Sequence, residues 1–234
     1  LTPRNGIPPI ATTGDIFEDS LVLNDVSDKT KIWYSWQDEP HKFPLFNYIR
    51  FETKEADEVT LIRSMGQHIV VCLRDSAWRV DFLPRPADSE FDIGRVKTQI
   101  EDALGCVGPQ AGALFNAGNG IQLAYISRYG LVFTDGFTWD IVTDDLDWNE
   151  TVNISKLPQA ILINNPKMYR LEMYYPSHGS NVNDKPLYFH YHPFHNKSDN
   201  SFRAKVSGPM DIPSECVFVA NIGNQHRVLV GQTG

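Results

Sequence analysis

The sequence is poor in cysteine, in long apolar runs and in positive charge, and each shortage excludes a class of protein. Its three cysteines, Cys72, Cys106 and Cys216, lie far apart and form no metal-binding or redox motif. We expect them to be free, buried thiols of a reducing compartment. No run approaches the roughly 18 apolar residues of a membrane-spanning helix, so we expect no membrane span.

The net charge of the chain is −8, and its pI is near 5.3. Phosphates are bound by clustered lysine and arginine, so a nucleic-acid-binding surface over the whole protein is not expected, although a local basic lining stays possible. The shares of apolar and charged residues, 41% and 21%, are those of a folded globular protein rather than a disordered one.

The chain also lacks a convincing helix of three turns. Arg95–Leu104 has apolar residues at helical spacing, but a strand fits its context better. Elsewhere short apolar segments recur at a spacing of roughly ten residues, separated by turn-forming residues. This pattern is typical of an all-β propeller, barrel or sandwich.

The clearest strand pattern runs from Gly105 to Trp139. We expect four strands here: Ala111–Phe115, Ile121–Ile126, Leu131–Thr134 and Phe137–Val142. Asn119-Gly120 is a strong hairpin signal because both residues tolerate positive φ. Four short strands joined by tight turns form one antiparallel sheet of the size of a propeller blade.

This sheet has a partial repeat upstream. Three pairs of residues recur at one constant spacing: Gly66 and Gly120, Arg74 and Arg128, Asp81 and Asp135. In both copies an apolar strand leads into the arginine, and a second strand ends at the aspartate. Internal similarity of this kind indicates a repeat architecture.

The two ends of the chain are expected to differ from its middle. Residues 1–14 hold three prolines and two glycines, so we predict an extended N-terminal arm, followed by a β-propeller domain over residues 15–234. Ile16–Asn24 is predicted as one strand. The end of the chain, Val228–Gly234, resembles a strand and turn without a partner strand, so we expect a piece of a longer polypeptide or the ordered part of one.

Histidines are concentrated at His190, His192 and His195. Residues two apart on a strand share a face, so these three side chains are candidates for a metal site. A packed or hydrogen-bonded trio is the alternative that we favour, because no second ligand cluster is evident. We therefore assign no metal, cofactor-binding or catalytic residue.

An acidic group follows the Gly105–Trp139 segment: Asp140, Asp144, Asp145, Asp147 and Glu150. Calcium takes oxygen ligands of this kind. The group lacks the glycine-punctuated spacing of a calcium loop, so a solvated connection between sheets is favoured.

Aromatic residues form a further candidate site: Trp33, Tyr34, Trp36, Tyr174, Tyr175, Tyr188 and Tyr191. Exposed aromatic rings suit a sugar or a protein partner, whereas buried rings are ordinary packing in a sheet. Period-2 counting along the predicted strand Lys31–Trp36 puts Trp33 and Trp36 on opposite faces.

Asp135-Gly136-Phe137-Thr138-Trp139 resembles the Asp box of sialidase-type propellers, Ser-x-Asp-x-Gly-x-Thr-Trp. The residue between Asp and Gly is missing, and Phe133 stands where serine is expected. The box is a structural turn, so the resemblance implies a propeller rather than glycosidase activity.

The segment Gly105–Gln110, followed by Ser127–Leu131 and Thr134–Gly136, resembles the blade signature of propeller proteins in bacteriophage particles. The closest functional type is the hub or nozzle at the distal end of a short phage tail. The resemblance covers about residues 45–175. It implies a structural virion protein of the tail and not an enzyme. Such proteins form a homo-oligomeric ring, commonly a hexamer, below the head-to-tail adaptor and beside other tail proteins. DNA leaves through the ring without sequence-specific binding.

Residues 1–14 and the loop Pro176–Lys185 are our candidates for docking arms toward neighbouring proteins, with plain surface as the alternative. Two other functions stay open. One is a tail-tip or receptor-binding module for host glycan or protein, centred on Trp33 and Trp36. The other is a sialidase-like glycosidase. Its candidate residues would be Arg74, Asp81, Arg128 and Asp135.

Overall fold

The computed structural model describes residues 5–53, 57–82, 95–116, 118, 120–143, 146–191, 205–208, 216–222 and 225–231. Within these residues the predicted all-β class is confirmed. The described helices are one α helix, α1 (Trp148–Thr151), and two 3-10 turns, η1 (Leu157–Gln159) and η2 (Pro166–Met168). The chain forms two compact units, Leu1–Pro109 with Gly136–Thr138, and Gln110–Asp135 with Trp139–Gly234.

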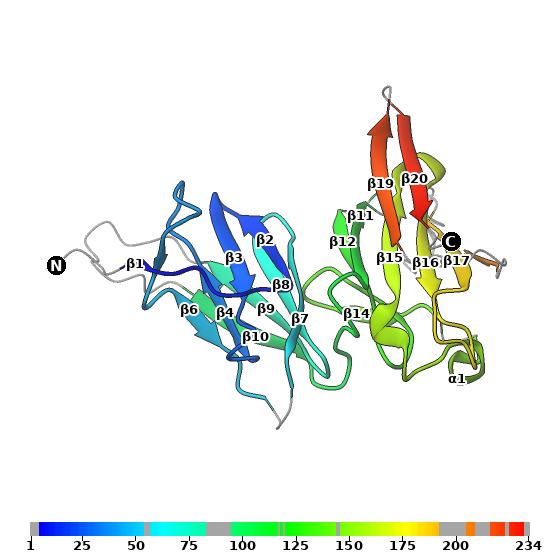
Figure 1. Ribbon diagram of the computed structural model, residues 1–234, viewed down its shortest axis with the longest axis horizontal. Coiled ribbons are helices and arrows are strands. Elements are labelled where there is room, and N and C mark those ends of the chain that lie inside the picture. Colours follow the sequence, from blue (N-terminus) through cyan, green and yellow to red (C-terminus); the bar gives the residue numbers. More distant parts are fainter. Residues whose placement is uncertain are drawn as a thin grey trace. The chain divides into compact units, whose positions relative to one another are not determined.

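The first unit contains two four-stranded antiparallel sheets, coloured blue to green in Figure 1. In each sheet every strand pairs with the strand before it, so both sheets are meanders. The first sheet holds β2 (Gly14–Phe17), β3 (Ser20–Asn24), β4 (Lys31–Tyr34) and β6 (Tyr48–Arg50). The second sheet holds β7 (Val59–Ser64), β8 (His68–Leu73), β9 (Ala77–Phe82) and β10 (Arg95–Glu101). A separate short ladder pairs β1 (Asn5–Gly6) with β5 (Phe43–Pro44).

The prediction of a single strand over Ile16–Asn24 is wrong. The segment folds back at Glu18-Asp19, whose φ angles are 45° and 60°, and Phe17 pairs with Ser20. Two successive residues of positive φ are the geometry of a type I′ hairpin, which usually contains Asn-Gly. Glu-Asp gives no such signal, so the hairpin could not be recognised from the residues.

Both sheets of the first unit share one apolar core. Phe17, Val22 and Ile32 of the first sheet pack with Ile69 and Val71 of the second, and all five are at most 2% exposed. Alternate residues of each strand point into this core, as the period of two in a strand requires. Arg95–Glu101 is a strand, as predicted, and pairs with β9.

The second unit contains two further four-stranded meanders and one hairpin, coloured green to red in Figure 1. The third sheet holds β11 (Gly112–Asn116), β12 (Ile121–Ile126), β13 (Leu131–Thr134) and β14 (Trp139–Ile141). The fourth holds β15 (Ile161–Asn165), β16 (Arg170–Tyr175), β17 (Lys185–His190) and β18 (Lys205–Ser207). The hairpin pairs β19 (Cys216–Ile222) with β20 (Gln225–Gly231). The four strands predicted between Gly105 and Trp139 are thereby confirmed.

The sheets begin at a recurring interval, and within each unit neighbouring sheets contact each other through their first strands. These strands start at residues 14, 59, 112, 161 and 216, a period of roughly fifty residues that lies in the range of propeller blades. Within the first unit β2 packs against β7, and within the second unit β11 packs against β15 and β15 against β19. The repeat seen in sequence follows this interval, since Gly66 and Gly120 both lie between the first two strands of a sheet, with φ of 88° and 138°.

In the part of the chain that the structure describes, no helix is long and apolar enough to cross a membrane.

Candidate functional site

The first sheet has one buried face and one accessible face, and the accessible one is the main candidate surface. Five apolar residues point away from the core here, in alternation with the buried ones: Ile16, Leu21, Leu23, Trp33 and Tyr48. Ile16 is 65% exposed and Tyr48 43%, while the other three are half-buried. We call this set the open face.

Trp33 and Tyr48 form an aromatic pair at one end of the open face. Their ring centroids are 5.4 Å apart, and Lys31 Nζ lies 4.0 Å from the Trp33 ring and 4.3 Å from the Tyr48 ring. Trp33 Nε1 donates to Asp25 Oδ2 at 2.9 Å. Burial alone would raise the pKa of Asp25, but hydrogen bonds from Ser27 and Trp33 outweigh it and lower the pKa. The ionised carboxylate therefore fixes the indole ring.

The other aromatic candidates are core residues rather than a surface. Tyr34, Tyr174, Tyr175, Tyr188 and Tyr191 are each at most 6% exposed. Burial raises the pKa of Tyr175 and of Tyr191 to about 12. The packing interpretation is confirmed for these five.

Trp36 lies outside the predicted strand, because β4 ends at Tyr34. It forms an isolated bridge with Glu39, and its N–H donates to the Lys42 carbonyl at 3.0 Å. The strand periodicity of two therefore cannot be used to place Trp36 relative to Trp33.

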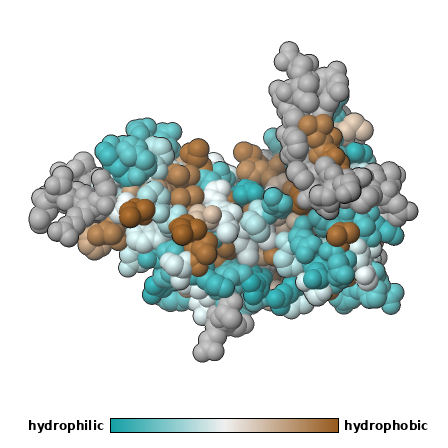
Figure 2. Space-filling view, viewed as in Figure 1, coloured by the Kyte–Doolittle hydropathy of each residue, from teal (hydrophilic) through white to brown (hydrophobic). Residues whose placement is uncertain are grey.

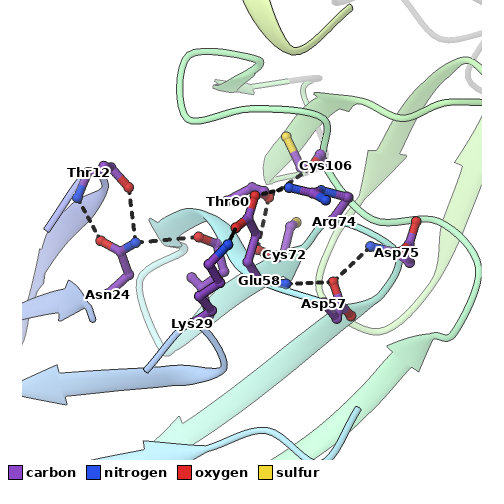
Figure 3. Close-up of polar contacts among 11 residues, drawn as sticks. Thr12, Asn24, Lys29, Asp57, Glu58, Thr60, Cys72, Arg74, Asp75 and Cys106 are labelled. Atoms are coloured by element: carbon purple, nitrogen blue, oxygen red, sulfur yellow. Dashed lines mark hydrogen bonds and ion pairs between the residues drawn. The ribbon is translucent and has the colours of Figure 1, made fainter. Parts of the chain in front are cut away.

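Arg74, one of the repeat-related residues, belongs to an ion-pair network in the first unit (Figure 3). It pairs with Glu58, whose second oxygen lies 2.9 Å from Lys29 Nζ. Burial would raise the pKa of Glu58, but the two cationic side chains outweigh burial and lower it. Asp81 pairs in turn with Arg79 at 2.8 Å. Arg74 and Asp81 are each held in an ion pair with another residue, Glu58 and Arg79, as structural groups are. These contacts give no support to a catalytic role.

Asp57 is a buried carboxylate beside that network. It accepts hydrogen bonds from the N–H groups of Glu58 and Asp75 at 2.9 and 3.2 Å (Figure 3). It also accepts one from the Ser76 hydroxyl at 3.2 Å. Burial raises its pKa, and the charge of Asp75 adds to the effect. Asp57 lines a cavity of about 340 Å³ together with Asp75, Glu52 and Asp102.

The turn that resembles an Asp box connects β13 to β14. Its residues Gly136–Thr138 belong to the first unit. The Phe137 ring lies 5.4 Å from the His68 ring, and the Arg79 guanidinium lies 4.1 Å from its centroid. These contacts give the turn a packing role, consistent with a structural reading of the motif.

Of the three clustered histidines, His190 lies within the described residues, and His192 and His195 lie outside them. His190 Nε2 is 2.8 Å from the Ser207 hydroxyl of the neighbouring strand. In the acidic group, Asp144 and Asp145 are outside the described residues, and Asp147 caps α1 by accepting from the Glu150 N–H. Among the described side chains, no group of three or more His, Cys, Asp or Glu is placed to hold a metal ion.

Two of the three cysteines, Cys72 and Cys106, are free and buried, as predicted; burial raises the pKa of Cys72. Their backbone carbonyls lie 3.2 and 2.8 Å from the Thr60 hydroxyl, which can donate to either (Figure 3). The side chain of Cys216 lies outside the described residues.

The two candidate docking arms are partly fixed to the fold. Asn24 holds the backbone of Thr12 and Thr13, whereas Ile7 and Ile10 are more than 80% exposed. The loop at 176–185 is closed by Ser177, whose N–H and hydroxyl donate to Asp184 at 2.7 and 2.6 Å.

A polar network in the second unit was not predicted. Glu172, only 1% exposed, accepts from Arg170 Nε and Asn165 Nδ2 at 2.8 Å and from the Tyr174 hydroxyl at 2.9 Å. Burial and the nearby Glu172 carboxylate raise the pKa of Tyr174. In sequence, polar residues alternate with apolar ones here: Arg170, Glu172 and Tyr174. Such alternation predicts that one face of the strand is exposed to solvent.

No protein-family model matches this chain, and no curated protein matches it.

Proposed function

We propose that this chain is a β-propeller, complete or in part, that serves as a structural subunit of a bacteriophage tail. Its place is a hub or nozzle ring, below the head-to-tail adaptor and around the path of the exiting DNA. The subunit assembles into the ring, and DNA passes through it. Its sheets pack on one another, and the loops between the sheets contact neighbouring proteins.

One observation carries the propeller part of this proposal. The four-stranded sheets are meanders in chain order, and first strands lie side by side within each unit: β2 with β7, β11 with β15, and β15 with β19. Meander sheets that repeat around a common axis, each with its first strand innermost, form a propeller. The hairpin β19–β20 fits the first two strands of a fifth such sheet.

The loop that carries the resemblance to phage propellers packs against the second sheet. Cys106 N–H donates to the Leu73 carbonyl at 2.8 Å, so the loop is fixed to the turn after β8. A Cβ at Gly105 would lie 2.2 Å from that same carbonyl oxygen, so only glycine fits. Gly105 and Cys106 thus attach the loop after β10 to the end of β8 in the second sheet.

The acidic composition is compatible with a conduit, because a lumen of like charge keeps DNA from adhering. The test is localisation. Phage particles labelled with antibody against this chain are imaged by negative stain. Label at the far end of the tail supports the proposal. Label on fibres, or none on the particle, contradicts it.

A binding module is the second candidate, favoured by the Trp33–Tyr48 pair on the open face. An aromatic pair at a partly exposed site suits a sugar ring or a protein partner. The isolated protein is applied to an array of host glycans. Binding that is lost in Trp33→Ala but kept in Trp36→Ala would favour this module over the structural role.

A further inference from the structure

The face of the second sheet that points away from the core of the first unit carries a buried histidine. In β8, Ile69, Val71 and Leu73 point into that core, so the alternation of a strand places His68 on the opposite face. His68 is only 7% exposed. Histidine is the one side chain whose ordinary pKa lets it change charge between pH 5 and 8. The groups that pack on His68 therefore decide whether it responds to mild acid.

The turn Gly136–Thr138, which joins β13 to β14, packs on this histidine. Gly136 has a φ of 88°, and a Cβ there would collide with His68 Nε2. The backbone of the turn therefore lies directly against that edge of the imidazole. The Phe137 ring meets the imidazole edge-on, with centroids 5.4 Å apart and an angle of 77° between the planes. Arg79 Cζ lies 4.1 Å from the Phe137 centroid.

Exposure alone does not distinguish this turn. Phe137 is 64% exposed, but Figure 2 shows apolar residues exposed at several places on the first unit. What distinguishes the turn is that its backbone and its aromatic ring both rest on a side chain that titrates.

Protonation of His68 would change the contact with Gly136. A neutral imidazole carries its proton on one ring nitrogen only, and the close approach of Gly136 to Nε2 fits the form with the proton on Nδ1. Protonation adds an N–H at Nε2 that points at the Gly136 backbone. It also places a positive charge in a buried site, which burial disfavours. Both effects weaken the packing of the turn on the ring.

Charged side chains surround His68 in equal numbers of each sign. β9 contributes Asp81, which register places opposite His68, and Arg79 on the same face. These two residues pair with each other at 2.8 Å. Register places Arg63 of β7 on this face as well, and Asp135 immediately precedes the turn. A proton on the imidazole therefore adds a positive charge to a set that is already balanced.

We infer that His68 is an acid-sensitive latch, which holds the turn Gly136–Thr138 on the second sheet while the imidazole is neutral and releases it when the imidazole is protonated. The inference is independent of the proposed function, because it depends only on contacts within the first unit. Protonation favours the released turn, so the closed form is lost as pH falls. A histidine in water has a pKa of about 6.5. A proton that binds to the released form therefore raises the ratio of released to closed turn about tenfold at pH 5.5 and hardly at pH 7.5.

Hydrogen exchange of the full chain, measured by mass spectrometry at pH 7.5 and pH 5.5, tests the latch. Exchange rates are corrected for the intrinsic pH dependence of amide exchange. Amides of residues 135–139 should lose protection about tenfold at pH 5.5, because local opening sets their exchange. Amides of β12 (Ile121–Ile126) serve as the internal reference and should keep their protection.

Three variants separate the latch from other effects of acid. His68→Gln removes the titrating ring, so the effect of pH on residues 135–139 should disappear. His178→Gln, the same change at an exposed histidine, should leave the effect in place. Gly136→Ala adds the Cβ that collides with the imidazole, so the turn should be released at both pH values.

Any of three results would overturn the inference. Equal protection of the wild-type turn at the two pH values would show that acid does not open it. A pH effect that persists in His68→Gln would place the responsible proton elsewhere. Loss of protection throughout the chain at pH 5.5 would show global unfolding rather than a latch. None of these results bears on assembly or on localisation in a tail, so the proposed function is tested separately.

Discussion

The side-chain amide of Asn24 accepts a hydrogen bond from the backbone N–H of Thr12 at 2.8 Å (Figure 3). Its oxygen also accepts from the Thr13 N–H at 3.1 Å, and its nitrogen lies 3.4 Å from the Val59 carbonyl. Asn24 is only 5% exposed. One side chain therefore joins the end of the N-terminal arm to β3, the strand that carries Asn24, and to Val59 of β7 in the second sheet.

Asn24→Leu should destabilise the protein, because it leaves the buried N–H of Thr13 and the partly buried N–H of Thr12 without their acceptor. The expected loss is about 2–6 kcal/mol in the free energy of unfolding, at about 1–3 kcal/mol for each unsatisfied group. Urea unfolding monitored by tryptophan fluorescence measures it. Asn116→Leu, the same change at an exposed asparagine whose side chain accepts an exposed hydrogen bond from the Gly118 N–H, serves as the control, and an equal loss there would contradict the special role of Asn24.

Glu58→Gln should make the free energy of unfolding vary less with pH in the acid range. The pKa of Glu58 is lowered in the folded state below its ordinary value of 4.5. Its ion pairs with Lys29 and Arg74 therefore contribute above that ordinary value and are lost as pH falls through the lower, folded-state pKa.

Because the Lys29 and Arg74 side chains are more than a third exposed, solvent screening limits the contribution to less than about 1 kcal/mol. Thermal unfolding of wild type and Glu58→Gln from pH 7 to pH 3 measures it. The two melting curves should converge at the acid end. A difference that stays constant down to pH 3 would count against the pairing, and the exposed Glu150→Gln should show no difference.

Glu172→Ala should be the most damaging single change among these. The Glu172 carboxylate is nearly closed to solvent and balances the charge of Arg170, so its removal leaves that cation without an anionic partner. We expect a loss of about 3–5 kcal/mol, measured by guanidinium unfolding. Glu172→Gln, which keeps the side-chain shape and one carbonyl acceptor, should lose less. Equal losses in the two variants would show that charge balance is not the cause.

Asp19→Gly should stabilise the hairpin between β2 and β3. Asp19 has a φ of 60°, a backbone conformation that costs an L residue about 1 kcal/mol and costs glycine little. Asp19→Ala, which keeps a Cβ and removes the carboxylate, is the control and should not stabilise. The midpoint of urea unfolding checks both, and a gain in the alanine variant would trace the effect to charge instead of φ.

The strands of the third sheet could be predicted closely because their turns carry strong local signals. The bounds of Ile121–Ile126 and Leu131–Thr134 agree with the structure, since glycine and asparagine mark the turns on either side. The hairpin at Glu18-Asp19 had no such signal, and Trp36 was assigned to a strand that ends two residues earlier. In each case a tight turn without glycine or proline was responsible.

The candidate surface was predicted only in part for a different reason. Trp33 was identified, but its neighbour Tyr48 comes from a strand that pairs with β4 after an intervening loop, so their contact depends on register. Glu172 was missed because alternation of polar and apolar residues predicts a solvated face. That face is partly covered in the fold, where Val228 packs against Ile161 and Tyr174.

The most direct test of the account is the mass of the assembled protein. Native mass spectrometry of the full chain, followed by class averages of the same sample in negative stain, gives the number of copies and their arrangement. The account predicts a closed ring of about six copies, with cyclic symmetry. A monomer at all concentrations, or a trimer attached to a fibre, would contradict it.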